Sequence, residues 1–294
     1  MVVGASSFAV GSNRAIDLLI GKGIEVVKNP YGRKMTEKEI IEHLKGADGL
    51  LAGLEPLNEN VFSKSPGLRA IARIGIGMDN VDIAAAGRYG IKVSNTPDGP
   101  TEAVAEMTLA ALLTIIHNII PSNDDMHGGE WKKRIGRSIK ELTVFVIGCG
   151  RIGRRVADQM RSMGAEVLTY DKYFAHLSNC SFEDGLRRAD VITLHASGND
   201  TILSENEFRM MKDGVVILNS ARGSLISEDT LYDSLKDGKT SWFWGDTFWE
   251  EPYSGKLTEL SNAILTPHIC TYTVSCRDEM EMQATVNILK DLGY

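Results

Sequence analysis

Arg222, Glu251 and His268 each lie close behind a short apolar run in the second half of the chain, where a parallel strand would end. An arginine keeps its charge and can bind a carboxylate through two parallel hydrogen bonds. A histidine beside a carboxylate has its protonated form stabilised, which suits a group that gives a proton to a carbonyl oxygen. Each residue also has an ordinary structural interpretation, as a salt-bridge partner, a loop acid or a hydrogen-bonded histidine. A fold that brings them to one site is therefore needed before they indicate catalysis.

A glycine-rich turn predicts such a fold. The run 143–147 is too short for a helix and is typical of a buried parallel strand, and residues 151–163 have the apolar spacing of a helix. Between them, glycines at 148, 150 and 153 would allow a tight turn, close approach of a pyrophosphate and packing of the helix on the strand. An ordinary glycine-rich turn is the alternative interpretation.

The context of this turn favours a dinucleotide. A second predicted strand, 165–170, leads to Asp171, eighteen residues after Gly153. A carboxylate at this position accepts hydrogen bonds from an adenosine ribose and repels a 2′-phosphate. The pattern therefore predicts NAD as the cofactor, while the neighbouring Lys172 leaves NADP as an open alternative.

Length and composition limit the class of protein. The chain has 294 residues, 43% of them hydrophobic and 24% charged, which fits two soluble globular domains. A formal net charge of −7 argues against binding to nucleic acid or an anionic membrane. The most apolar segment, 107–120, is short for a membrane span and contains polar residues. Four cysteines without a paired motif and an N-terminus that resembles a first strand favour a cytoplasmic protein.

The first part of the chain alternates short strands with helices, which predicts a doubly wound parallel sheet. The expected strands are 2–5, 24–28, 49–52, 70–74 and 91–94, and the expected helices are 12–21, 36–45, 58–64 and 80–88. A long apolar helix should run from Thr101 to about Asn118. The polar stretch from Pro121 to Glu141 is expected to be surface or an oligomer arm.

The alternation resumes after Asp171, so a second parallel sheet is expected there. Its further strands should be 191–194, 215–218, 242–245 and 263–265, and its further helices 181–188, 204–211 and 228–235. A last helix, 274–292, could return to close the first domain. Ligands in such sheets bind outside the carboxyl ends of the strands, where the polar residues named above would lie.

The chain resembles the D-2-hydroxyacid dehydrogenase family, near its phosphoglycerate-dehydrogenase-like branch. The segments that carry the resemblance are 74–82, 95–97, 101–106, 148–153, 219–223, 246–252 and 266–269, in the family's order. The resemblance implies an α/β protein in which a Rossmann NAD-binding domain, 96–270, is inserted into a flavodoxin-like substrate-binding domain, 1–95 completed by 271–294. It also implies a homodimer formed through the Thr101 helix and the 120–141 arm.

The same resemblance implies the site residues. Arg222 would hold the substrate carboxylate, His268 would be the acid and base, and Glu251 would tune His268. The residues expected to contact the cofactor are Gly148, Gly150, Arg151, Ile152, Gly153, Asp171, Thr101, Val104, His195, Ser220, Ala221 and Asp246. The residues expected to contact the substrate are Gly53, Ile76, Gly77, Arg222 and His268. No metal site is predicted.

Several positions depart from the family pattern. Pro100 replaces an asparagine, Cys270 replaces a glycine, and Ser197 replaces a proline. Two indoles, Trp242 and Trp244, stand in a strand that usually has small residues, and core packing is favoured over a substrate contact for them.

The segment 51–56 has no arginine or lysine, where phosphoglycerate-type members carry positive charge. This favours NAD-dependent reduction of a small 2-oxo acid of the glyoxylate or hydroxypyruvate type. Arg73 leaves a phosphorylated or phosphonate acid possible as the substrate of a drifted dehydrogenase. A nicotinamide-sensing binding protein of the same fold is the alternative from another functional class.

Overall fold

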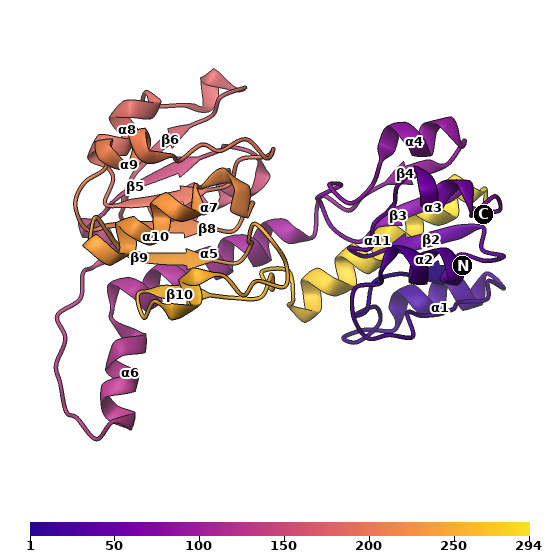
Figure 1. Cartoon of the computed structure of the whole chain (residues 1–294), viewed down its shortest axis with the longest axis horizontal. Helices are drawn as coiled ribbons and strands as arrows, with labels where there is room; N and C mark the ends of the chain where they lie inside the picture. The colour runs from indigo at the N-terminus through magenta and orange to yellow at the C-terminus, as the bar shows by residue number, and fades with distance from the viewer. The chain divides into compact units, whose positions relative to one another are not determined.

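The computed structural model describes residues 1–294, which divide into two compact units. Unit 1 comprises residues 1–100 and 272–294, and unit 2 comprises residues 101–271 (Figure 1). The boundaries expected from the sequence fell after residues 95 and 270, and those in the structure fall after residues 100 and 271. Each unit is described by itself.

Unit 1 is built on a four-stranded parallel sheet with the order β1-β2-β3-β4. Its strands are β1 (Val2–Val3), β2 (Gly49–Ala52), β3 (Ala70–Arg73) and β4 (Lys92–Ser94). Its helices are α1 (Arg14–Gly21), α2 (Glu37–His43), α3 (Glu59–Ser63), α4 (Ile83–Arg88) and α11 (Val274–Leu292). The four strands run in one direction, so their carboxyl ends share one edge of the sheet.

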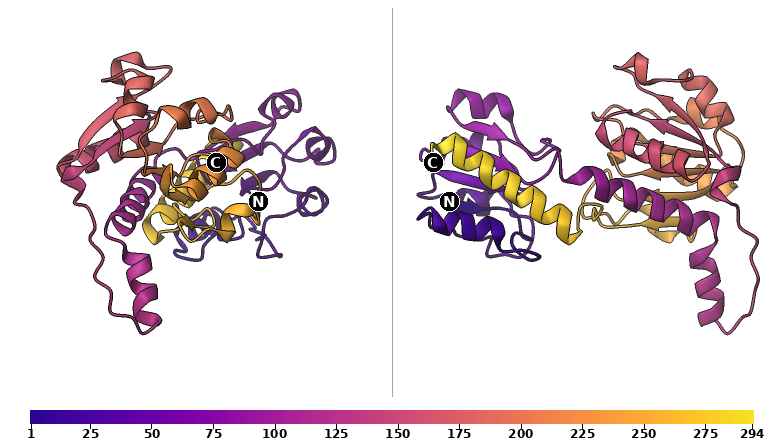
Figure 2. Two further views of the ribbon diagram at one scale, coloured as in Figure 1. Left: turned by 60° about the vertical axis from the view of Figure 1, so that its left-hand side comes forward. Right: turned by 180° about the vertical axis from the view of Figure 1, so that it is seen from behind.

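Helix α11 completes unit 1 from the far end of the chain, as the sequence predicted. It packs along β2, β3 and β4, as Figures 1 and 2 show. The helix is capped by the Thr273 hydroxyl, which accepts a hydrogen bond from the Cys276 amide. Its inner face, which includes Met280, Ala284 and Ile288, is buried.

The prediction of a strand at residues 24–28 is wrong. Only Val27 pairs with the sheet, as an isolated bridge to Val2. The Val3 amide donates to the Val27 carbonyl, and the Val27 amide donates to the Met1 carbonyl. Strand β1 is only two residues long, so the segment has only a short strand edge with which to pair.

Unit 2 contains a six-stranded parallel sheet with the order β10-β9-β8-β7-β5-β6. Its strands are β5 (Thr143–Ile147), β6 (Glu166–Tyr170), β7 (Val191–Leu194), β8 (Val215–Asn219), β9 (Thr240–Gly245) and β10 (Ala263–Leu265). Its helices are α5 (Pro100–Ile116, beginning at the boundary), α6 (Ile119–His127), α7 (Arg151–Ser162), α8 (Phe182–Arg188), α9 (Glu205–Met210) and α10 (Glu228–Asp237). Short 3-10 turns are η1 (Ile139–Glu141), η2 (Ala175–Leu177), η3 (Gly223–Leu225) and η4 (Lys256–Glu259).

The central strands of unit 2 are apolar on both faces because helices cover both sides of the sheet. Trp244 is 1% exposed in one of the two resulting cores, and Trp242 packs against the same core. The Trp244 indole donates a hydrogen bond to the Thr266 hydroxyl at 3.2 Å. The two indoles of β9 are therefore packing residues.

The stretch from Pro121 to Glu141 was expected to be surface or an oligomer arm, and its first part lies in helix α6, which the sequence had not predicted. The helix follows a break at Asn118, which has a left-handed backbone (φ 54°). Pro121 stands in its first turn, where a missing amide removes no helical hydrogen bond. None of its residues is buried.

No single helix is long and apolar enough to cross a membrane. Helices α5 and α6 meet that test only when taken together, and they are bent by 58° at their junction. Within α5, Ala105, Leu112 and Ile115 are buried in the core of unit 2.

Candidate active site

The three predicted catalytic residues follow neighbouring strands of unit 2. Arg222 comes after β8, Glu251 lies in the loop after β9, and His268 comes after β10. These strands are adjacent in the sheet, so their carboxyl ends lie together. The Glu251 carboxylate and His268 Nδ1 form a hydrogen bond of 2.9 Å between Oε2 and the ring nitrogen. Both side chains remain partly open to solvent, at 33% and 39% exposure.

The Glu251 carboxylate is also held through the oxygen that does not face His268. The second oxygen of Glu251, Oε1, accepts a hydrogen bond from the Phe248 amide at 3.1 Å. The Phe248 ring stacks on Tyr253 with a centroid distance of 4.5 Å, and the Tyr253 hydroxyl donates to Glu228 at 2.7 Å. With Oε1 held by the backbone, Oε2 is left for His268.

Asp246 holds the loop that carries His268. Its carboxylate is 1% exposed and accepts three hydrogen bonds, from the Thr266 hydroxyl (2.6 Å) and the amides of Ile269 and Cys270 (2.9 Å each). These bonds enclose His268, whose backbone has φ +54°, a conformation that costs free energy outside glycine. The structure thus gives Asp246 a role that the sequence did not predict, and its expected contact with the cofactor stays a prediction.

The backbone at Arg222 is set by Asn219, which is 1% exposed at the end of β8. The Asn219 side chain donates to the Arg222 carbonyl at 2.8 Å and accepts from the Ala221 amide at 3.0 Å. A side chain at Gly223 would overlap the backbone of Phe248, so this glycine lets the loops after β8 and β9 approach each other. Arg222 and Glu251 are carried by those two loops.

The glycine turn lies at the other half of the same sheet edge, between β5 and α7. Gly148 has φ +93°, and a Cβ there would lie 2.5 Å from the Ala196 amide nitrogen. A Cβ at Gly153 would overlap the Gly148 carbonyl oxygen. A Cβ at Gly150, the N-cap residue directly before the 12-residue helix α7, would meet nothing within 4 Å. Two of the glycines are thus required by packing, and the third leaves space for a ligand.

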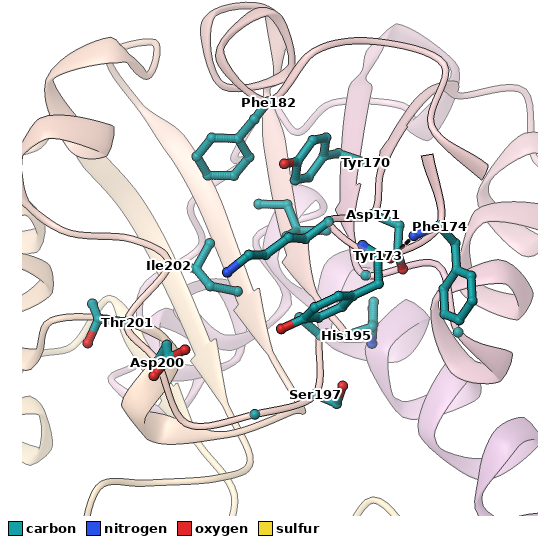
Figure 3. Close-up of a pocket in the computed structure, with 16 residues that line it drawn as sticks. Tyr170, Asp171, Tyr173, Phe174, Phe182, His195, Ser197, Asp200, Thr201 and Ile202 are labelled. Atoms are coloured by element: carbon teal, nitrogen blue, oxygen red, sulfur yellow. Dashed lines mark hydrogen bonds between the residues drawn. The ribbon is translucent and has the colours of Figure 1, made fainter. Parts of the chain in front are cut away.

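A pocket of about 390 Å³ opens beside this turn, at the ends of β5, β6 and β7 (Figure 3). Four predicted cofactor residues line it: Gly148, Gly150, Asp171 and His195. The sequence analysis missed its aromatic walls, Tyr170, Tyr173, Phe174 and Phe182. Their signal was available, since three of them flank Asp171 in the sequence.

The Asp171 carboxylate organises this pocket. One oxygen accepts from the Cys149 amide at 2.7 Å, and the other accepts from the amides of Tyr173 (2.9 Å) and Phe174 (3.0 Å). Partial burial alone would raise the pKa of the group, but these amide hydrogen bonds hold the pKa below its usual value. The oxygen with a single donor keeps a lone pair with which it can accept a ribose hydroxyl.

His195 lies in the middle of the sheet edge, after β7. Its Nε2 is 2.8 Å from the Thr193 hydroxyl and its Nδ1 is 3.4 Å from the Ser220 hydroxyl. Burial lowers the pKa of the imidazole to about 3, so the ring is neutral at physiological pH. His195 and Ser220 thereby connect the pocket with the Arg222 loop.

The remaining predicted cofactor residues stand in the same unit. Arg151 and Ile152 form the first turn of α7, and Ala221 precedes Arg222. Val104 of α5 is 5% exposed, and the buried hydroxyl of Thr101 has no hydrogen-bond partner in the chain. The open face at Gly150, the Asp171 carboxylate and the unsatisfied Thr101 hydroxyl fit a dinucleotide such as NAD.

The predicted substrate residues of unit 1 differ in whether their backbone amides are hydrogen-bonded within the chain. The Ile76 carbonyl accepts a hydrogen bond from Asn95 at 2.8 Å, whereas the amides of Ile76 and Gly77 have no partner in the chain. The Gly53 amide, in contrast, donates to both oxygens of Glu55, at 3.0 and 3.1 Å. The Gly53 amide is thus engaged within the chain, and a contact of Gly53 with substrate stays a prediction.

The structure contains no group of three or more histidine, cysteine, aspartate or glutamate side chains that could hold a metal ion. All four cysteines are free. Cys149, within the glycine turn, is 2% exposed, so its side chain packs in the interior.

Comparison with known proteins places this geometry in a family. Residues 109–270 match the model of the D-isomer specific 2-hydroxyacid dehydrogenase NAD-binding domain. A D-3-phosphoglycerate dehydrogenase of Methanocaldococcus jannaschii is 35% identical over 80% of this chain and 48% of its own length. A glyoxylate reductase of Pyrococcus horikoshii is 32% identical over 91% of this chain and 88% of its own length. The chain spans about half the length of the D-3-phosphoglycerate dehydrogenases that it matches.

Solved structures with a similar fold support the same family. The TT0316 protein of Thermus thermophilus has a TM-score of 0.88 and 29% identity, covering 99% of this chain and 97% of its own. A D-lactate dehydrogenase of Aquifex aeolicus, complexed with NAD and lactic acid, has a TM-score of 0.85 and 27% identity, covering 99% and 95%. The sequence motifs, the two parallel sheets and these matches agree that the chain belongs to the D-2-hydroxyacid dehydrogenase family, with NAD as the family's cofactor.

Proposed function

We propose that this protein uses NADH to reduce a small, non-phosphorylated 2-oxo acid, of the glyoxylate or hydroxypyruvate type, to the corresponding 2-hydroxy acid. The observation that carries the proposal is the 2.9 Å pair of His268 and Glu251 at the strand edge that also carries Arg222. A proton donor and a fixed cation are the two groups that reduction of a 2-oxo acid requires of the protein.

Each of the three residues has a separate task in this proposal. Bound NADH supplies the hydride that reduces C2 of the acid. Arg222 binds the substrate carboxylate and offsets the negative charge that develops on the carbonyl oxygen. His268 supplies the proton to that oxygen from Nε2, since Nδ1 is engaged with Glu251. Glu251 keeps the ring in one orientation and stabilises its protonated form.

The cofactor is held in this proposal by the residues of the glycine turn and the pocket. The amides at the start of α7 face the pyrophosphate, and Asp171 accepts a ribose hydroxyl. The same carboxylate repels a 2′-phosphate, which supports NAD over NADP. The open space at Gly150 supports the close approach of the pyrophosphate.

The substrate class rests on the residues of unit 1. The relatives include both glyoxylate reductases and D-3-phosphoglycerate dehydrogenases at similar identity, so their names do not choose between the two. The segment 51–56 carries no arginine or lysine, whereas phosphoglycerate-type members carry positive charge there. A small acid without a phosphate is therefore favoured.

NADH consumption against a panel of 2-oxo acids tests the proposal. The panel contains glyoxylate, hydroxypyruvate, pyruvate and 3-phosphohydroxypyruvate, each followed at 340 nm with NADH and with NADPH. The proposal expects turnover with the small acids, and a higher kcat/KM for them than for the phosphorylated acid. NADH binding without turnover of any acid would instead favour a nicotinamide-sensing protein.

We also propose that the protein is a cytoplasmic homodimer formed through α5, α6 and the segment that follows α6. Apolar side chains on α6 and this segment are exposed, including Ile119 (52%), Trp131 (79%) and Ile135 (98%). Burying them against a second copy would be favourable. Light scattering should give twice the mass of one chain, and a monomer would contradict the assembly.

A further inference from the structure

Trp244 packs in the core of unit 2, but the one polar atom of its indole has a specific partner. The side chain is 1% exposed, and its Nε1 donates to the Thr266 hydroxyl at 3.2 Å. Thr266 directly follows β10, the strand that pairs with β9. An indole N–H can only donate a hydrogen bond. The direction of this bond is therefore fixed, and the bond occupies an acceptor position of the Thr266 oxygen.

The Thr266 hydroxyl in turn donates to Asp246. Its single proton can reach Asp246 Oδ1 at 2.6 Å, whereas the Gly245 carbonyl oxygen is 3.5 Å away. The shorter distance assigns the proton to the carboxylate. Hydrogen bonds in series polarise one another, so the bond from the indole strengthens the bond to the carboxylate. Trp244, Thr266 and Asp246 thus form a hydrogen-bonded relay within unit 2.

The relay ends at the backbone around His268. Asp246 accepts hydrogen bonds from the amides of Ile269 and Cys270, each at 2.9 Å. The Thr266 carbonyl accepts one from the His268 amide, also at 2.9 Å. His268 has φ +54°, a conformation that persists only where the surrounding contacts enforce it. The hydrogen bonds of these three successive amides all go to Thr266 or Asp246.

Two other indoles of unit 2 do not join this relay. Trp242 stands two residues before Trp244 in β9 and packs against the same core, but its indole makes no hydrogen bond within the chain. The Trp249 indole donates to the Ile226 carbonyl at 2.8 Å. Of these three tryptophans, only Trp244 is hydrogen-bonded to the residues that hold His268.

We propose that Trp244 is a positioning residue for His268. Its indole N–H, acting through Thr266 and Asp246, holds the loop that presents the imidazole. His268 remains the proton donor, and Trp244, buried in the core, acts only through these partners. The inference rests on the proposed function for the task of His268, whereas the relay itself is a property of unit 2 alone.

Amide hydrogen exchange of the full chain, followed residue by residue by NMR, tests the relay without turnover. In Trp244→Phe, the amides of Ile269 and Cys270 should exchange about fivefold faster, the effect expected for the loss of one supporting hydrogen bond. The Cys149 amide, which donates to Asp171 at the other half of the same sheet edge, should keep its rate. Trp242→Phe is the matched control, because it truncates an indole of the same core and should leave all three rates unchanged.

Three outcomes of this experiment overturn the inference. Unchanged exchange of Ile269 and Cys270 in Trp244→Phe would show that the indole N–H does not hold the loop. Equal acceleration of the Cys149 amide would show that Trp244 only stabilises unit 2 as a whole. The same acceleration in Trp242→Phe would show that packing of an indole, and not its hydrogen bond, is what the loop requires.

Thr266 offers a second pair of variants, which serves if Trp244→Phe does not fold. Thr266→Val keeps the shape of the side chain without the hydroxyl, so the amides of Ile269 and Cys270 should exchange about tenfold faster. Thr266→Ser keeps the hydroxyl and should keep the slow rates. Trp244→Phe combined with Thr266→Val should be no faster than Thr266→Val alone, since both changes break the same relay. Additive effects would mean that Trp244 acts by another route, against the proposal.

Kinetics complete the test where a 2-oxo acid is turned over. Trp244→Phe should lower kcat about fivefold and leave the Kd for NADH, measured by NADH fluorescence, within about twofold. A raised Kd with an unchanged kcat would assign Trp244 to cofactor binding and overturn the inference. If no acid is reduced, the proposed function fails, and the exchange rates still decide the role of Trp244.

Discussion

The two units present the same kind of sheet edge and use their glycines in opposite ways. At the edge of unit 2, Gly150 leaves a space that nothing in the chain occupies. At the edge of unit 1, Gly4 and Gly53 leave a space that Glu55 fills. A glycine after a parallel strand therefore shows that something approaches the backbone closely, and only the structure shows whether that is a ligand or another part of the chain.

The acids at the two edges differ in the same way. In unit 2, Asp171 and Asp246 accept backbone amides and thereby shape the loops around the pocket and His268. In unit 1, the Glu55 carboxylate accepts the Gly53 amide and fills the space left by Gly4 and Gly53 at the ends of β1 and β2. The difference is that the acids of unit 2 shape loops around a pocket and a histidine, whereas the acid of unit 1 fills a space between two strand ends.

The largest expected effect tests the assignment of chemistry to unit 2. His268→Gln removes the proton donor and should lower kcat about 10³-fold, while NADH binding by fluorescence titration stays within about twofold. Glu250→Gln is the matched control, since this exposed neighbour of Glu251 should leave kcat unchanged. Normal turnover in His268→Gln would remove His268 from the mechanism.

The second prediction separates two glycines of one turn by stability and binding. In Gly153→Ala the new Cβ would overlap the Gly148 carbonyl oxygen, so α7 must shift, at a cost of about 2–3 kcal/mol in urea unfolding. In Gly150→Ala the Cβ meets nothing, so stability should change by less than about 0.5 kcal/mol. NADH affinity of Gly150→Ala should nevertheless fall about tenfold, because the Cβ enters the proposed pyrophosphate position. Unchanged NADH affinity would show that the space at Gly150 is not used.

Most strands and helices could be predicted because their signals are local. The runs that form β2, β7 and β10 are apolar and bounded by turn residues, and the predicted and observed bounds coincide. Helix α6 was missed because a proline and polar residues argue against a helix unless the proline falls in the first turn. The strand predicted at 24–28 failed because pairing depends on the length of β1, which lies elsewhere in the sequence.

The site shows the same division. His268 and Glu251, seventeen residues apart, could be paired only through the family resemblance, and the structure places them 2.9 Å apart. No local pattern indicated that Asp246 holds the loop of His268 or that Glu55 reaches back to Gly53 and Gly4. Such contacts depend on which strand ends are adjacent, and strand order is not written in any single segment.

The third prediction applies the same substitution at both edges. Glu251→Gln keeps an acceptor for His268 Nδ1 but removes the charge that stabilises the protonated ring, so kcat should fall about tenfold for every acid turned over. Glu55→Gln should leave kcat unchanged for each acid, because the amide fills the same space between the ends of β1 and β2 in unit 1. Steady-state kinetics on both variants with two acids checks this. A lowered kcat in Glu55→Gln would contradict this difference between the two edges.

The smallest expected effect concerns His195, the neutral imidazole at the centre of the unit 2 edge. Its pKa is about 3 in the folded chain and about 6.5 when unfolded, so only the unfolded chain takes up the proton as the pH falls below 6.5. The stability from this histidine is present above that pH and is lost as the pH falls, by at most about 1.3 kcal/mol between pH 7.5 and 5.5. The His195→Asn variant has no imidazole at this position, so it does not lose this stability as the pH falls. The stability difference between the unsubstituted protein and the variant, measured by urea unfolding, should therefore narrow by that amount over this range. A constant difference would mean that the ring can be protonated in place, and that the centre of this edge is as open to a ligand as the space at Gly150.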